Sequence, residues 1–168
     1  MRPLAGSYPE YYNTYISLVA ENTIAEALMK NEGEVLAMLR SINEEKGNYA
    51  YASGKWSIKE LFVHLIDTER IFCYRALSFA RRDDQTLPSF EHDDFVKNSK
   101  ANNRTMSSIL EEFESVRRAS ITLFKSFDET DLHHLGNIPS GKISVAAIGF
   151  AICGHYAHHM NVIRQRYS

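Results

Sequence analysis

Hydrophobic residues recur at intervals of three and four positions over four long stretches of the chain, which is the pattern of an amphipathic helix. In the first stretch, about 22–43, the apolar positions include Ile24, Leu28, Val35 and Leu39. The other stretches lie at about 57–80, 105–127 and 144–166. No segment has the alternation of apolar and polar residues that is typical of a half-buried strand. The pattern therefore predicts an all-α protein, and the simplest arrangement is a four-helix bundle.

Signals at the helix ends support the same division. Ser57 can cap the second helix through its hydroxyl, and Glu60, three residues later, can bond back to the cap amide. Ser144 opens the fourth helix after a loop that contains Pro139 and Gly141. The segment between the second and third helices is much longer than a tight hairpin. We expect it to form a crossover connection in place of a simple up-down-up-down topology.

The length of 168 residues fits one domain, which we expect to span residues 1–168. Residues 1–20 are rich in proline and tyrosine, which suggests a strap or short helix over the main body. The net charge is −2, and basic pairs such as Arg81-Arg82 have acidic neighbours. Because nucleic-acid binding usually needs a basic surface, we expect no nucleic-acid partner.

The first residues form no apolar run of signal-peptide length, and no later stretch is long and apolar enough for a membrane span. We therefore expect a cytoplasmic protein with no membrane partner. The two cysteines, Cys73 and Cys153, are far apart and lie inside helical patterns without CxxC spacing. We interpret both as small buried hydrophobic residues.

Three of the seven histidines lie close together in the segment GHYAHH near the C-terminus. His155 and His159 are about 40° apart on the fourth helix, on the stripe that faces the core. His158 lies at the edge of this stripe, where a supporting or surface role is more natural. Two imidazoles at i and i+4 can point to one metal ion, although such pairs also occur as ordinary core or surface histidines.

His64 on the second helix can supply a third ligand. It lies seven residues after Ser57, and His159 lies a similar distance before the end of the fourth helix, so antiparallel helices place both at one level. His64 also lies beside Thr68 and Arg75, where it can face a polar pocket between helices. Burial of three imidazoles without partners costs several kcal/mol. Three neutral imidazoles suit Zn, Ni, Cu or Fe and leave coordination positions open, as in a catalytic site.

Asp67 follows His64 at i+3 and has two interpretations. As a catalytic residue it would orient a ligand imidazole or accept a proton from metal-bound water. Alternatively, it forms an ion pair with Arg70 on the helix surface. For Glu69 we favour a structural role. His92 could reach the site from its loop, but its setting fits an exposed loop histidine better.

Two motifs in combination give the sequence a family resemblance. They are GKWSIKELFVHLIDTERIFCYRAL and, after a loop with LPSFEHDDF, GHYAHHMNVIRQRY. From about residue 22 onwards the chain resembles the DinB-like superfamily, including its YfiT branch of metal-dependent hydrolases. The resemblance implies a four-helix bundle, often a homodimer, that holds a divalent metal, commonly nickel or zinc. Its ligand positions fall on His64, His155 and His159.

One position departs from the family pattern. Many relatives have an acidic residue after the first histidine of the C-terminal motif, where this chain has Tyr156. The resemblance therefore leaves the acid–base role to Asp67 or to bound water.

The resemblance also implies an activity. Relatives include thiol-S-transferases that use a low-molecular-weight thiol. We hypothesise a metal-dependent enzyme for a small-molecule substrate, either a thiol-S-transferase or a hydrolase, in which the metal activates a thiol or water. The alternative is a non-catalytic stress-response bundle with a structural or vestigial metal site. A catalytic site would leave an open metal position facing a pocket, whereas a structural site would be sealed.

Overall fold

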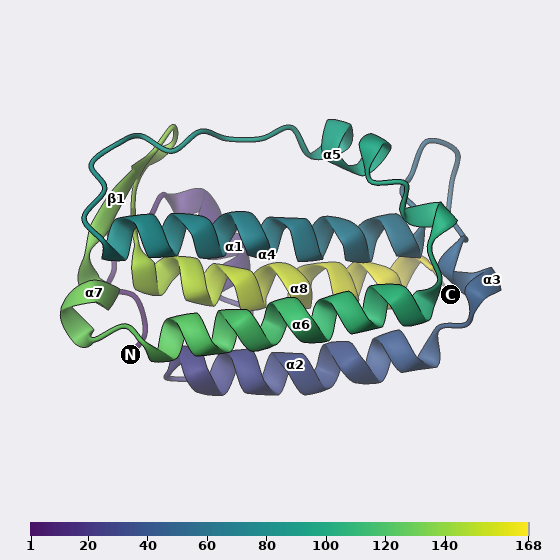
Figure 1. Ribbon diagram of the computed structural model, residues 1–168, viewed down its shortest axis with the longest axis horizontal. Helices are drawn as coiled ribbons and strands as arrows, with labels where there is room; N and C mark the ends of the chain where they lie inside the picture. The colour runs from purple at the N-terminus through teal and green to yellow at the C-terminus, as the bar shows by residue number, and fades with distance from the viewer. Residues whose placement is uncertain (168) are drawn as a thin grey trace.

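Four long helices lie side by side and form the body of the molecule (Figure 1). The structure is a computed structural model that describes residues 1–167; Ser168, the last residue of the expected domain, lies outside the described residues. The four helices are α2 (Ile24–Ser41), α4 (Ile58–Ala80), α6 (Met106–Lys125) and α8 (Val145–Arg166). Their bounds agree closely with the four periodic stretches. The predicted all-α four-helix bundle is confirmed.

Each bundle helix begins with a side chain that caps its free backbone amides. At α4 the Ser57 hydroxyl accepts from the Glu60 amide at 3.1 Å, and the Glu60 carboxylate accepts from the Ser57 amide at 2.7 Å. This reciprocal pair satisfies two amides that would otherwise lack partners. The helix start predicted from these two residues is confirmed. The caps of the other three helices are Thr23, Thr105 and Ser144.

The connection between α4 and α6 runs back along the length of the bundle, so that α4 and α6 are parallel (Figure 1). This connection contains α5 (His92–Asn98) and the 3-10 helix η2 (Ala101–Asn103). Helices α2 and α8 also run parallel to each other and antiparallel to α4. In the bundle, α4 packs against α6 and α8, and α2 packs against the same two helices. The expected crossover connection is confirmed.

A short β-hairpin precedes α8, and the expectation that no segment forms a strand is wrong at this point. Strand β1 (Leu135–Ile138) pairs antiparallel with β2 (Gly141–Ser144), after the short helix α7 (Glu129–His133). Strands of four residues are too short to give a clear alternating pattern. A Cβ at Gly136 would lie 2.0 Å from the Phe79 ring, so only glycine lets β1 cross that side chain.

The N-terminal residues lie against α8. They contain the 3-10 helix η1 (Glu10–Tyr12) and the short helix α1 (Asn13–Ile16), and α1 packs on α8. A Cβ at Gly154 would lie 2.1 Å from the carbonyl oxygen of Tyr15. Glycine at this position therefore allows the backbone of Tyr15 to approach α8 closely, beside the histidines of that helix.

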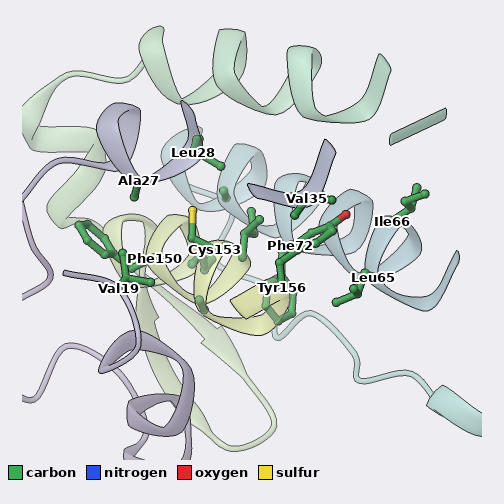
Figure 2. Close-up of a cluster of buried hydrophobic side chains, with 14 of the residues drawn as sticks. Val19, Ala27, Leu28, Val35, Leu65, Ile66, Phe72, Phe150, Cys153 and Tyr156 are labelled. Atoms are coloured by element: carbon green, nitrogen blue, oxygen red, sulfur yellow. The ribbon is translucent and has the colours of Figure 1, made fainter. Parts of the chain in front are cut away.

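Buried hydrophobic side chains from all four bundle helices, α2, α4, α6 and α8, form one continuous core, part of which is shown in Figure 2. Cys153 is buried within it, as expected, whereas Cys73 is only half-buried. A short helix, α3 (Glu44–Gly47), closes the end of the bundle at which α2 ends. None of the helices in residues 1–167 combines the length and apolar character that crossing a membrane requires.

Candidate metal centre

Three histidines from two antiparallel helices meet at one point. His64 comes from α4, and His155 and His159 come from α8. The distance from His155 Nε2 is 3.3 Å to His64 Nε2 and 3.1 Å to His159 Nε2. One ligand atom from each ring lies within 4.8 Å of the other two. The structure therefore brings together the three residues that the sequence analysis named as metal ligands.

Burial keeps these imidazoles neutral. His64 is 3% exposed and His155 is 6% exposed. Burial and then the proximity of His159 lower the pKa of His64 to about 3. Burial and then His158 lower the pKa of His159 to about 4. The pKa of His155 is lowered well below its usual value, mainly by burial. At neutral pH all three rings thus have lone pairs available for a metal.

The donor set fits a metal ion better than it fits a set of hydrogen bonds. An imidazole nitrogen carries either one proton or one lone pair, so His155 Nε2 can make only one well-directed hydrogen bond to its two neighbours. Metal–nitrogen distances of about 2.1 Å at tetrahedral or octahedral angles place ligand nitrogens roughly 3.0–3.4 Å apart. The separations of 3.1 Å and 3.3 Å lie in this range.

Aromatic side chains surround the cluster. The ring of Trp56 lies 4.8 Å from the ring of His64, and the ring of Tyr15 meets His155 edge-on at 5.2 Å. His92, at the start of α5, lies 5.2 Å from His64, centroid to centroid. Its side chain is exposed, as expected, yet it stands at the rim of the site. His158, half-buried, also meets Tyr15 edge-on, with ring centroids 5.7 Å apart.

Two pockets reach the histidine cluster. A cleft of about 340 Å³ includes His159 and Trp56 in its lining. A smaller pocket of about 130 Å³ includes His155 and His92. The cluster is therefore accessible from two sides, as an open coordination position requires.

Asp67 forms an ion pair with Arg70. Its carboxylate lies 3.5 Å from the Arg70 guanidinium, which also binds Glu112 of α6 at 2.6 Å. Burial raises the pKa of Asp67, although Arg70 opposes this shift. Within the described residues, the group able to hold a metal consists of three histidines and does not include Asp67. A catalytic role for Asp67 stays a prediction.

Glu69 and Tyr156 belong to a buried polar network away from the histidines. The Glu69 carboxylate accepts two hydrogen bonds from Arg117 at 2.9 Å and 3.1 Å, as its structural interpretation leads one to expect. The Tyr156 ring lies 4.8 Å from the Arg117 guanidinium carbon. Position 156 thus faces the core of the bundle, so an acidic residue there would meet Arg117 and not the histidine cluster.

The aromatic lining was not identified as part of the site from the sequence. Trp56 precedes the cap of α4, where a hydrophobic residue normally packs onto the first helical turn. Tyr15 lies outside every periodic stretch, so no local pattern connects it to His155. The contact of Tyr15 with His155 joins distant segments, whereas Trp56 and His64 are only eight residues apart on or just before α4.

The metal-free protein is expected to lose stability on acidification. The pKa values of about 3 for His64 and about 4 for His159 lie below the usual 6.5 of an exposed histidine. Below about pH 6.5 the unfolded chain binds more protons, so each histidine lowers the free energy of unfolding by up to about 1.4 kcal/mol per pH unit. Above about pH 6.5 these histidines do not change the free energy of unfolding with pH. Urea unfolding between about pH 7 and pH 5 measures the effect.

The double substitution His64→Gln and His159→Gln supplies the control for this experiment. Neutral glutamines take up no protons, so the variant should lose most of the histidine-dependent slope. An identical slope in both proteins would contradict the assignment of neutral imidazoles at His64 and His159.

Comparisons with known proteins place the chain in a family. A protein of Oceanobacillus iheyensis named "Putative metal-dependent hydrolase OB0413" is 25% identical over 132 residues, covering 75% of this chain and 73% of the relative. The structure of YfiT from Bacillus subtilis, described as "a probable metal-dependent hydrolase with an unusual four-helix bundle topology", shares the fold. It matches with a TM-score of 0.68 and 13% identity over 98% of this chain and 93% of YfiT. The sequence profile of the DinB superfamily matches residues 27–163, and the chain therefore belongs to the DinB superfamily.

Proposed function

We propose that the protein is a metal-dependent hydrolase in which His64, His155 and His159 hold a divalent metal. One observation carries the proposal: three neutral imidazoles, two buried and one half-buried, converge on a point that two pockets reach. The names of two relatives, one curated protein and one solved structure, support the same class of activity.

In this proposal the three histidines would bind the metal, and the surrounding side chains hold the histidine rings in position. A divalent metal supplies Lewis acidity, which brings the pKa of a coordinated water or thiol toward neutrality or polarises a substrate carbonyl. Trp56 and Tyr15 pack against His64 and His155, which limits the rotation of the ligand rings. Asp67 remains the proposed acid–base residue, and it would have to leave its ion pair with Arg70 to act.

A second candidate function, thiol-S-transfer, is favoured by the presence of a pocket on each side of the cluster. Two pockets give room for two reactants, one on the His155 side and one on the His159 side. The thiol would be a separate small molecule. Burial raises the pKa of Cys73 to about 11 and that of Cys153 to about 12, so neither cysteine supplies a thiolate at neutral pH.

The non-catalytic alternative fits the geometry less well. A structural metal site is normally closed by four protein ligands, whereas this group offers three and borders two pockets. Nickel or zinc as the metal, a homodimer and a cytoplasmic location remain parts of the proposal that rest on the family resemblance and the sequence.

The test compares metal-loaded, chelator-treated and reconstituted protein against a panel of small esters and amides, with and without an added low-molecular-weight thiol. Hydrolysis that needs metal but no thiol is expected. Turnover only with the added thiol would instead favour the transferase. Asp67→Asn should bind metal as the wild type does but lose most of kcat if Asp67 is the acid–base residue. Absence of turnover in every condition would favour the non-catalytic alternative.

A further inference from the structure

Arg75 is a buried cation without an anionic partner. It lies on α4, is 6% exposed, and forms no ion pair with any residue of 1–167. Its Nη2 donates to the Pro88 carbonyl at 2.5 Å, and the neutral hydroxyl of Tyr12 lies beside the guanidinium. By contrast, Arg117, the other buried arginine, is paired with Glu69. A buried charge without a counter-ion is costly, so the unpaired guanidinium needs an explanation.

The guanidinium borders the smaller of the two pockets that reach the histidine cluster. This pocket, of about 130 Å³, includes Arg75, Thr68 and His155 in its lining. Thr68 Oγ1 is buried and has no hydrogen-bond partner in the described part of the chain. His64, Thr68 and Arg75 lie on one face of α4, because positions 4 and 11 residues along a helix are rotated by about 40° and 20°.

The other walls of the pocket are largely aromatic. Tyr12, Phe72 and Phe90 contribute rings to it, and the Arg75 guanidinium carbon lies 5.8 Å from the Phe72 centroid. A cavity of about 150 Å³ is known to hold one benzene molecule, so the volume suits an apolar group of that size. The pocket thus combines an aromatic body, one fixed cation and one candidate metal ligand.

We propose that this pocket binds a small carboxylate with a ring-sized apolar body. The carboxylate pairs with Arg75, Thr68 can add a hydrogen bond, and the reacting group faces the metal on the His155 side. The planar guanidinium fork matches a carboxylate, and a single cation suits a singly charged group better than a phosphate dianion. The inference rests on the proposed function, since it takes the metal as the place of reaction.

Benzoate is the probe, and benzamide, which has the same size without the charge, is its matched control. Binding is measured by titration calorimetry on chelator-treated and on metal-loaded protein. We expect wild type to prefer benzoate by about tenfold or more in both states, because the ion pair with Arg75 does not require the metal. Arg75→Gln should abolish this preference, and Arg75→Lys should keep part of it. Arg70→Gln, on the same helix but outside the pocket, should leave it unchanged.

Several outcomes would overturn the inference. They are absence of benzoate binding to wild type, equal binding of both probes, a preference that survives in Arg75→Gln, or a preference confined to the metal-loaded state. Circular dichroism and metal content are recorded for each variant, and Arg75→Lys serves if Arg75→Gln does not fold. Failure of the proposed function can be told apart from failure of this inference. Arg75-dependent binding to a protein without turnover would retain this inference, whereas metal-dependent turnover without a benzoate preference would reject it alone.

Discussion

His155→Ala is expected to reduce the bound metal from about one ion per chain to almost none, and to abolish metal-dependent turnover. His155 is the central ligand, because its Nε2 lies 3.3 Å from that of His64 and 3.1 Å from that of His159. Its loss leaves two ligands that do not close a site. The affinity should fall by more than the roughly 10- to 100-fold that loss of an outer partner of a ligand costs. Mass spectrometry of the purified, reconstituted protein measures the metal content.

His158→Ala is the matched control for this substitution. His158 lies on the same helix and contacts His159 and Tyr15, but it is not among the three grouped ligands. This variant should keep the metal content of wild type. Thermal unfolding of both chelator-treated variants shows whether each one still folds, because bound metal would itself stabilise the native state and is absent here. This measurement separates loss of metal from misfolding. Full metal content in His155→Ala would refute the three-histidine site.

Arg117→Met is expected to cause the largest loss of stability, about 3–5 kcal/mol. Arg117 is fully buried, and its guanidinium donates to Glu69 of α4, and to Asn31 Oδ1 at 2.9 Å and the Leu28 carbonyl at 3.2 Å, both of α2. Burial alone would lower the pKa of Arg117, but the Glu69 carboxylate more than offsets this and raises it. Without Arg117, the carboxylate of Glu69 stays buried with no cation. Urea unfolding at neutral pH measures the loss.

The double variant Glu69→Leu and Arg117→Met tests the reason for that loss. Replacement of both charges removes the uncompensated carboxylate, so the double variant should be more stable than Arg117→Met alone. Arg40→Met is the surface control: Arg40 pairs with Glu114 at 3.3 Å between exposed side chains, and its loss should cost about 1 kcal/mol or less. A double variant as unstable as Arg117→Met would contradict the explanation by an unpaired charge.

The sequence predicted the long helices and their starts well, because a helix depends on contacts between near neighbours. Ser57 and Glu60 are three residues apart, and their capping pair needs no other part of the chain. The short β-hairpin was missed for the converse reason. Its four-residue strands depend on each other and on the passage of Gly136 over Phe79, which no local pattern reveals.

In the candidate site, too, the features that depend on near neighbours were predicted from the sequence, and those that depend on helix packing were not. The i, i+4 spacing of His155 and His159 is local, so the sequence alone indicated a pair on one face of a helix, and His64 followed from the assumption of antiparallel helices. The contacts of Asp67 with Arg70 were one of two open interpretations, and the direction in which Tyr156 points was not foreseen. The contact of Tyr156 with Arg117 depends on which helix lies beside α8, whereas Asp67 and Arg70 are only three residues apart on α4.

The sequence by itself determined the four long helices, the caps at Ser57 and Ser144, and the pair of His155 and His159, since these depend on residues within a few positions of one another. Only the tertiary structure decided that Arg117 crosses the core to Glu69, and that Arg75 stands unpaired in a pocket beside His155. The crossover connection carries Pro88 to Arg75 and Phe90 to the pocket. Such contacts join segments far apart in the chain, and they are fixed by how the helices pack rather than by the pattern within any one of them.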